Sequence, residues 1–259
     1  MFNTTIATQI YAKICFEATN SQKKIIENLS EYLSDDDFSR IFVLNGFAGT
    51  GKTTLIAAVV AALKELRIKP VLLAPTGRAA KVLARYCGEQ ALTIHKRIYR
   101  QRTNADYESK FSLDFNREQG AVFIVDEASM LSDSTGDGAL FGSGSLLEDL
   151  VSYVRSGRGC RLILVGDSAQ LPPVGCDFSP ALDPATVSRY GEVVYGLMDE
   201  VVRQQMQSGI LFNATLVRCM LENRIYEIPK FEMDYPDFES VEGGDFMEKL
   251  QDAFDRYGR

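Results

Sequence analysis

Short apolar runs recur along most of the chain, and polar or turn-forming residues bound each of them. The runs are Ile41–Leu44, Val71–Ala74, Ala121–Val125, Arg161–Val165 and Val193–Leu197. Apolar residues that follow one another, rather than alternating with polar ones, are typical of strands buried on both faces of a sheet. The pattern therefore predicts several central strands of one sheet.

Helical patterns fill the intervals between these runs. Leu55–Leu66 is apolar and rich in alanine, a second stretch runs from Gly77 to Tyr86, and Leu146–Val154 precedes the fourth run. Alternating strands and helices predict a parallel sheet with crossover helices. The expected fold class is therefore α/β, a parallel sheet flanked by helices, whose ligands bind at the carboxyl ends of the strands.

Two further helices are expected ahead of the first strand. Residues 4–16 place Ile6 and Ile10 at helical spacing, so we expect a short helix packed on the domain. A second, amphipathic helix should begin near Asn20 or Ser21, and either residue can cap it. Residues 96–119 are polar and weakly periodic, and they are compatible with either an inserted hairpin or a long loop.

The first apolar run leads directly into a glycine-rich loop that fits the pattern G-x-x-x-x-G-K-[ST], and a helical stretch follows at once. Strand, loop and helix in this order are the context of a phosphate-binding loop. Glycine lets backbone N–H groups turn toward a triphosphate, and the helix N-terminus adds positive charge. The residues predicted to bind ATP here are Gly46, Phe47, Ala48, Gly49, Thr50, Gly51, Lys52, Thr53 and Thr54.

Individual roles follow from the chemistry of the side chains. Lys52 should reach the β- and γ-phosphates, and the Thr53 hydroxyl should hold Mg²⁺. The third apolar run ends in Asp126 and Glu127. On an exposed surface this acidic pair would mean nothing, but after a buried strand it suits an ATPase: Asp126 would bind Mg²⁺, and Glu127 would deprotonate the attacking water.

The fourth apolar run ends in a turn, residues 166–175, that contains two successive prolines. Proline restricts the backbone, so the turn should hold Gln170 at the carboxyl end of its strand. That position lies beside the expected nucleotide rather than in solvent.

Composition places few further limits on function. The five cysteines are scattered without a C-x-x-C pair, so we expect reduced thiols. No run approaches the ~18 apolar residues of a membrane span, and no basic region precedes an apolar core at the N-terminus. We therefore expect a cytoplasmic protein.

The net charge of −7 conceals an uneven distribution of charge. Residues 78–102 contain seven Lys or Arg against one acid, whereas residues 219–259 contain eleven acids against five Lys or Arg. A local basic patch matters more for phosphate contact than the total does. The basic stretch is either such a patch or a solvated helix face.

Several blocks together resemble one family, the RecD-like helicases of superfamily one, which move 5′ to 3′ on single-stranded DNA. The blocks are residues 46–54, 73–83, 93–95, 125–130, 166–175 and 201–204, and the resemblance extends from about Gln22 to Arg203. It implies a RecA-like fold of the P-loop NTPase class, with ATP and Mg²⁺ as ligands.

The resemblance also implies roles for residues that the loop pattern does not reach. Gln22 resembles the glutamine that reads adenine, although a solvated first-turn glutamine is the alternative. Gln170 resembles the sensor that joins the γ-phosphate to the DNA surface. Arg203 resembles an arginine that contacts the γ-phosphate, with a surface ion pair as the alternative.

Two further blocks resemble segments that contact the DNA backbone. A turn that leads into a helix can offer N–H groups and a hydroxyl to phosphates without sequence preference. His95 is the only histidine, and without the resemblance a packed or surface role would be the simpler interpretation. The residues in question are Pro75, Thr76, Gly77, Arg78, Thr93 and His95.

Members of this family continue into a second RecA-like domain, for which this chain offers no motif after Arg203. We expect an N-terminal helical segment (1–38), a RecA-like ATPase domain (39–225) and an acidic segment (226–259) leading toward that domain. The chain would then be a truncated or split helicase motor that hydrolyses ATP but does not unwind DNA alone. Its expected partners are single-stranded DNA and a second RecA-like domain, with no membrane. The alternatives are a nucleotide-switched binding module and, less in keeping with residues 166–175, a small-molecule kinase.

Overall fold

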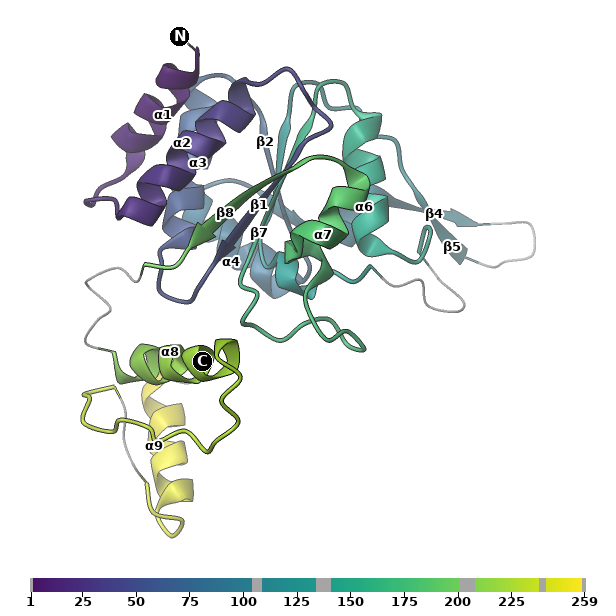
Figure 1. Cartoon of the computed structure of the whole chain (residues 1–259). Coiled ribbons are helices and arrows are strands. Elements are labelled where there is room, and N and C mark those ends of the chain that lie inside the picture. The colour runs from purple at the N-terminus through teal and green to yellow at the C-terminus, as the bar shows by residue number, and fades with distance from the viewer. Residues whose placement is uncertain (1, 104–108, 134–140, 201–207, 238–240, 258–259) are drawn as a thin grey trace. The chain divides into compact units, whose positions relative to one another are not determined.

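The computed structural model describes residues 2–103, 109–133, 141–200, 208–237 and 241–257. The chain divides into two compact units, Met1–Val201 and Val202–Arg259, and each is described by itself (Figure 1). The boundaries expected from the sequence, after residues 38 and 225, stay predictions.

The first unit is built on a parallel sheet. Six of the described strands form it in the order β3-β2-β6-β7-β1-β8. Register pairs Asn45 of β1 with Gly166 of β7 and with Leu197 of β8, so the carboxyl ends of these strands meet at one edge. The strands are β1 Ile41–Gly46, β2 Pro70–Ala74, β3 Ala91–Thr93, β6 Val122–Val125, β7 Arg161–Gly166 and β8 Val193–Met198. The predicted α/β fold with a parallel sheet is confirmed.

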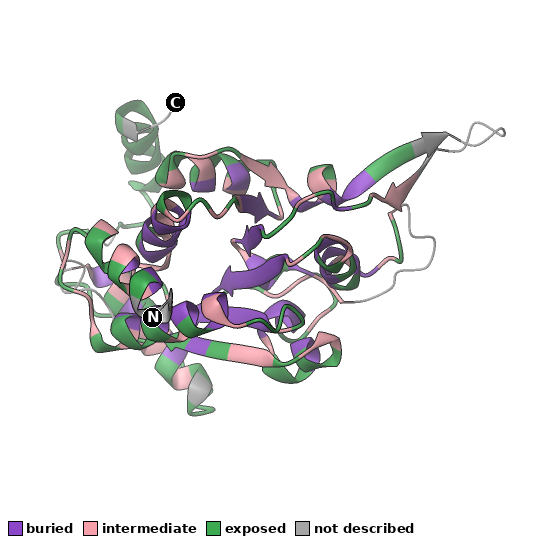
Figure 2. Cartoon of the chain, turned by 90° about the horizontal axis from the view of Figure 1, so that it is seen from above, coloured by how far each residue is buried: buried purple, intermediate pink, exposed green. Residues whose placement is uncertain are grey.

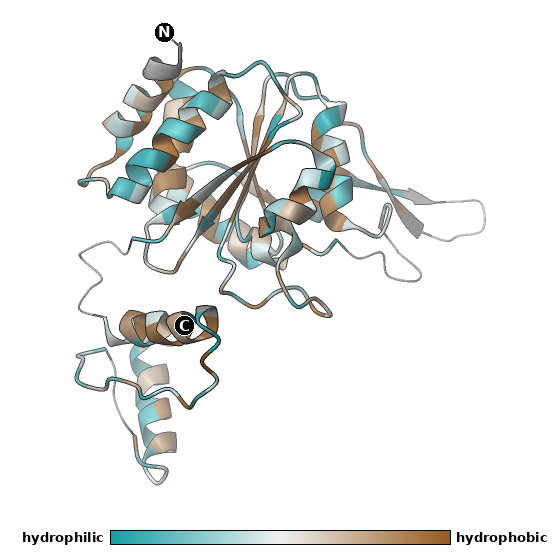
Figure 3. Cartoon of the chain, in the orientation of Figure 1, coloured by the Kyte–Doolittle hydropathy of each residue, from teal (hydrophilic) through white to brown (hydrophobic). Residues whose placement is uncertain are grey.

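Helices cover both faces of this sheet. They are α1 Phe2–Lys13, α2 Asn20–Ser34, α3 Lys52–Glu65, α4 Gly77–Cys87, α5 Ile94–Ile98, α6 Leu146–Ser156 and α7 Pro184–Val187, with short 3₁₀ turns at Ala128–Met130, Pro180–Leu182 and Ser188–Tyr190. Successive strand residues enter two separate cores: Phe42 and Leu44 pack with α1 to α4, whereas Ile41 and Val43 pack with α5 and α6. The four central strands, β2, β6, β7 and β1, are accordingly buried (Figure 2) and largely hydrophobic (Figure 3).

The two predicted N-terminal helices are present, but the expected cap of the second was wrong. Thr19, not Asn20 or Ser21, caps α2: its hydroxyl accepts from the Gln22 N–H, and the Gln22 side chain accepts from the Thr19 N–H. This reciprocal pair satisfies two backbone donors, which a cap at Asn20 or Ser21 without a glutamine three residues later would not do.

Residues 96–119 contain an antiparallel hairpin rather than a long loop. Its strands are β4 Tyr99–Thr103 and β5 Ser109–Leu113, with Tyr99 opposite Leu113. The stacked rings of Phe111 and Phe141, whose centroids are 4.5 Å apart, join the base of the hairpin to the segment ahead of α6. The Gly142 N–H strengthens this junction by donating to the Phe111 carbonyl.

The described residues of the second unit form two helices, α8 Gly209–Glu222 and α9 Phe246–Tyr257. The side chain of Asn213 joins α8 to the following segment, because its amide donates to the Glu232 carbonyl and accepts from the Glu232 N–H. The end of the predicted acidic segment, Phe246–Tyr257, is thus a helix. None of the described helices of either unit has the length and apolar character that a membrane crossing requires.

The buried position of α1 predicts that this helix is part of the folded core. Replacing Ile10, which is 0% exposed, with alanine should lower the free energy of unfolding by about 2–5 kcal/mol. Tyr11→Ala, on the 37% exposed neighbour, should cost less than about 1 kcal/mol. Urea denaturation measures both, and equal costs would contradict the packing of α1.

Candidate nucleotide-binding site

The loop after β1 has the backbone that phosphate binding requires. Gly49 and Gly51 have φ angles of 77° and 84°, in the left-handed region that glycine adopts without a steric penalty. Gly46 is required for a different reason: a Cβ there would lie 2.9 Å from Cγ and Cδ of Lys52. The Lys52 side chain therefore folds back over the loop, where its ammonium donates to the Phe47 carbonyl at 2.9 Å and to the Gly46 carbonyl.

The helix that follows this loop begins without a side-chain cap. Gly51 is the N-cap of α3 and offers no side chain, whereas Thr76, Thr93 and Ser145 accept hydrogen bonds from the first turns of α4, α5 and α6. The first N–H groups of a helix need an acceptor, and an anion is a suitable one. The loop and the start of α3 are thus suited to binding an anion.

Three carboxylates approach Lys52 from neighbouring strands. Asp167, directly after β7 and 2% exposed, lies 3.9 Å from the Lys52 ammonium. Asp126 and Glu127 follow β6, and Lys52 exerts a favourable charge interaction on both. The sequence analysis missed Asp167, although its place at the carboxyl end of the fourth apolar run was a usable signal.

The acidic pair after β6 is held in an environment that disfavours its charge. Burial raises the pKa of Asp126 above its usual range, and a backbone hydrogen bond and Lys52 only partly offset this. Burial, and then the charge of Asp126, raise the pKa of Glu127. Glu127 also has φ of 54°, an uncommon conformation for a residue other than glycine. Perturbed carboxyls and backbone strain in one cleft are typical of functional sites.

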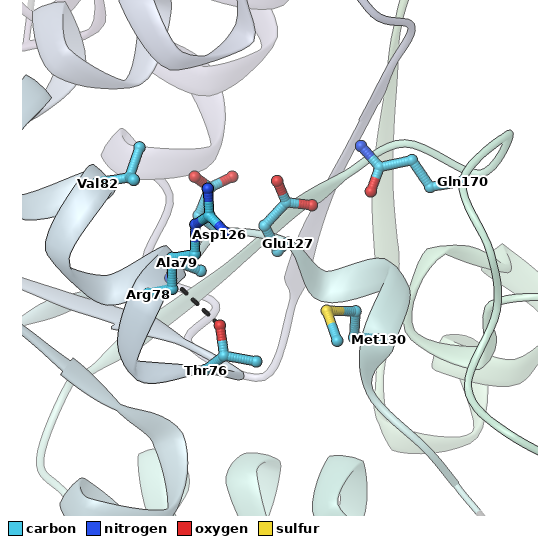
Figure 4. A pocket seen from close by; sticks show the side chains of 8 residues that line it. All are labelled: Thr76, Arg78, Ala79, Val82, Asp126, Glu127, Met130 and Gln170. Carbon is cyan, nitrogen blue, oxygen red and sulfur yellow. Dashed lines mark hydrogen bonds between the residues drawn. The ribbon is translucent and has the colours of Figure 1, made fainter. Parts of the chain in front are cut away.

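A pocket of about 340 Å³ lies in front of these groups (Figure 4). It is lined by Thr76, Arg78, Ala79, Val82, Asp126, Glu127, Met130 and Gln170. The Gln170 side chain points into this pocket toward Glu127. The structure therefore brings together the predicted catalytic residues Glu127 and Gln170 with Thr76 and Arg78 of the predicted DNA segment.

Gln22 contacts the phosphate loop from outside it. Its side-chain N–H donates to the Thr50 carbonyl at 2.9 Å, and its side chain is 0% exposed. The alternative of a solvated first-turn glutamine is therefore wrong. Its capping pair with Thr19 means that the N-terminal helices brace the loop through one buried amide. Contact with adenine stays a prediction.

The predicted DNA-contacting threonines occupy equivalent places in adjacent elements. Register pairs Ala74 of β2 with Thr93 of β3, and the hydroxyls of Thr76 and Thr93 cap the helices that follow these strands. Arg78 is exposed, as are Lys81 and Arg85 farther along α4. This sheet edge therefore presents hydroxyls and cations beside the pocket.

His95 lies among aromatic rings. Its ring is 5.1 Å from Phe141 and 5.7 Å from Tyr99, and burial lowers its pKa. The structure thus places His95 at the base of the hairpin, and a DNA contact stays a prediction. Arg203 and its block 201–204 lie outside the described residues, so their role also stays a prediction.

The site has the donors that a magnesium nucleotide needs. Mg²⁺ in such sites takes one or two protein oxygens together with phosphate and water. Thr53, in the first turn of α3, and the partly buried Asp126 carboxylate can supply those oxygens. No group of three or more His, Cys, Asp or Glu placed to hold a metal is found within the part of the chain that the structure describes.

Known proteins resemble this chain in sequence and in fold. A family model described as an AAA domain matches residues 17–211. The chain belongs to this AAA-domain family. Together with the phosphate-loop geometry, membership indicates a nucleotide-binding domain.

Among curated proteins, the chain is 31% identical over 154 residues to the ATP-dependent RecD2 DNA helicase of Deinococcus radiodurans, a match that covers 60% of the chain and 19% of that protein. It is 32% identical over 201 residues to the RecBCD enzyme subunit RecD of Mycobacterium tuberculosis, covering 63% and 32%. The chain therefore spans a third or less of the length of these relatives. The resemblance to RecD-like helicases is confirmed.

A solved structure shows the same fold. The Pif1 helicase from Bacteroides, in complex with ADP-AlF3 and single-stranded DNA, superposes with a TM-score of 0.52 at 17% identity, over 93% of this chain and 58% of that one. The shared architecture is that of a RecA-like sheet flanked by helices.

The raised pKa of Glu127 predicts a stability penalty for its charge. A carboxyl with a raised pKa in the folded state binds protons more tightly there, so stability rises as pH falls from the raised value toward the ordinary pKa of about 4.3. Glu127→Gln should therefore raise Tm at pH 7, and the difference should shrink as pH falls toward 4. Thermal unfolding without Mg²⁺ measures this, with the exposed Glu31→Gln as a control. A lower Tm for Glu127→Gln at pH 7 would contradict the assigned environment.

Proposed function

We propose that the chain is the ATP-hydrolysing motor domain of a DNA helicase that translocates on single-stranded DNA, and that it works with a second RecA-like domain on the same or a separate chain. The observation that carries this proposal is the set of Lys52, Asp126, Glu127 and Gln170 at one edge of the sheet, beside the exposed cations of α4. The helicase relatives support the assignment of the whole activity.

Hydrolysis in this proposal begins with Glu127, the partly buried second acid after β6. Glu127 takes a proton from water, the water oxygen attacks the γ-phosphorus, and the bond to the ADP oxygen breaks. A base with a pKa nearer the working pH is more effective, which suits the raised pKa of Glu127. Gln170 contacts the γ-phosphate and joins it to the DNA-binding surface.

The positive charges of the site act on the phosphates. Lys52 and the uncapped start of α3 hold the β- and γ-phosphates, and Arg203 adds a guanidinium at the γ-phosphate. Thr53 and Asp126 would hold Mg²⁺, which would neutralise part of the phosphate charge. Gln22 orients the adenine from the side of the N-terminal helices.

The sheet edge next to the pocket contacts the DNA backbone in this proposal. Pro75, Thr76, Gly77 and Arg78 at the start of α4, with Thr93 and His95 at the start of α5, provide N–H groups, hydroxyls and charge. Such contacts bind phosphates without reading bases.

A cytoplasmic location stays a prediction.

Replacing the proposed base should separate binding from chemistry. Glu127→Gln should lower the rate of ATP hydrolysis by a factor of about 10²–10⁴. Binding of a fluorescent ATP analogue with Mg²⁺ should be retained, since Lys52 and the loop are unchanged. Glu31→Gln, on the exposed face of α2, should hydrolyse ATP like the wild type.

Normal turnover by Glu127→Gln would reject the assignment. A wild-type chain that binds ATP and changes its affinity for a partner, without steady turnover, would instead favour the nucleotide-switched binding module.

The exposed cations of α4 provide a second test. Lys81→Ala/Arg85→Ala should weaken binding of a single-stranded oligonucleotide several-fold and reduce the slope of log affinity against log salt by roughly 1 to 2. Lys23→Ala/Lys24→Ala removes the same number of exposed charges from α2 and should leave that slope unchanged. Fluorescence anisotropy at several salt concentrations measures both variants. Equal losses in the two variants would show that only overall charge matters.

A further inference from the structure

A polar side chain interrupts the buried strand that leads into the phosphate loop. The four residues before it, Ile41 to Leu44, are at most 2% exposed, and Asn45 is 5% exposed. An apolar residue there would bury more easily, because a buried amide must find hydrogen-bond partners. Asn45 therefore requires an explanation beyond packing.

The amide of Asn45 is used on both sides. Its oxygen accepts from the Ser168 backbone N–H at 3.0 Å. Its nitrogen donates to the Ser168 hydroxyl at 2.8 Å and to the Tyr195 hydroxyl at 3.0 Å. The orientation of the amide is fixed by chemistry, since a backbone N–H can only donate and must face the amide oxygen.

These bonds connect three strands at the edge where the candidate site lies. Asn45 comes directly before Gly46 of the phosphate loop, Ser168 directly after Asp167, and Tyr195 belongs to β8. The turn after β7 is itself braced, because the Asp167 carboxylate accepts from the Ala169 N–H and the Asp167 carbonyl accepts from the Gln170 N–H. Movement of the phosphate loop is thus linked to the backbone that carries Gln170.

A second link joins the same two segments. The Lys52 ammonium lies 3.9 Å from Asp167. A nucleotide that draws Lys52 toward its phosphates would weaken that charge pair, whereas the Asn45 amide contacts are independent of Lys52. The Asn45 contacts can therefore maintain the connection between the phosphate loop and the turn after β7 when the Lys52–Asp167 pair is weakened.

We propose that Asn45 is a positioning residue that holds the Asp167–Gln170 turn against the phosphate loop. Gln170 is then correctly placed when the loop binds a triphosphate. This inference rests on the proposed function, because it assigns Asn45 to the same hydrolytic site. Asn45 does not touch the phosphates in this proposal and acts through Ser168.

Asn45→Ala should reduce kcat by about 10-fold or more, because small displacements of a catalytic group have large effects on rate. The Kd for ATP should change by less than about threefold, since the loop and Lys52 remain. In a Gln170→Ala background the same substitution should change kcat by less than about twofold, because residues that act as a unit are not additive. Ser168→Ala, at an exposed position, removes one of the three hydrogen bonds of the Asn45 amide. It should therefore lower kcat by a smaller factor than Asn45→Ala does.

A second buried asparagine provides the control for a merely structural role. Asn116 is 1% exposed, and its amide donates to the Val154 carbonyl and accepts from the Glu118 N–H, at the opposite edge of the sheet. Asn116→Ala should lower stability without changing kcat or Kd. Equal effects of Asn116→Ala and Asn45→Ala on kcat, or full additivity of Asn45→Ala with Gln170→Ala, would overturn the proposal.

Hydrogen exchange distinguishes failure of this proposal from failure of the proposed function. A non-hydrolysable ATP analogue with Mg²⁺ should slow exchange in peptides covering residues 166–175 of the wild type, and this protection should be lost in Asn45→Ala. If wild type shows the protection but no hydrolysis, the proposed function fails while the link stands. Equal protection in Asn45→Ala and wild type, or none in wild type, would overturn the link.

Discussion

The electrostatic arrangement around Lys52 is the constraint on which the site depends. Parallel strands deliver their carboxyl ends to one edge, and two of those ends carry acids: Asp126 and Glu127 after β6, and Asp167 after β7. Lys52 is the cation set among them, 3.9 Å from Asp167. Three carboxylates beside one ammonium leave an excess of negative charge, which a divalent cation can balance. Burial amplifies each of these interactions because it lowers the local dielectric.

The central sheet could be predicted because its strands are buried on both faces. Four or five successive apolar residues, as in Val122–Val125, carry that signal without any knowledge of the fold. The phosphate loop could be predicted for a related reason, since its glycine, lysine and threonine serve backbone and charge requirements that are local in the sequence. Asp126 and Glu127 followed because they come directly after a predicted strand, and Gln170 because it lies in the proline-containing turn after the next predicted strand.

What the sequence left open depended on contacts between distant residues. The hairpin of β4 and β5 has no apolar run, and its base is joined to Phe141, about thirty positions beyond Phe111. Thr19 was overlooked as the cap of α2 because Thr, Asn and Ser all cap helices, and only the reciprocal bond with Gln22 decides among them. Asn45 and Ser168 gave no local signal at all, since their meeting follows from the pairing of β1 with β7.

ATP turnover by this chain, and its response to single-stranded DNA, tests the proposed motor function most directly. Steady-state hydrolysis should be measured at low salt, with and without an oligonucleotide, because phosphate contacts weaken as salt rises. The account predicts hydrolysis that requires Lys52 and increases when the oligonucleotide is added. A chain that neither binds nor hydrolyses ATP, or whose behaviour is unchanged by Lys52→Ala, would contradict it.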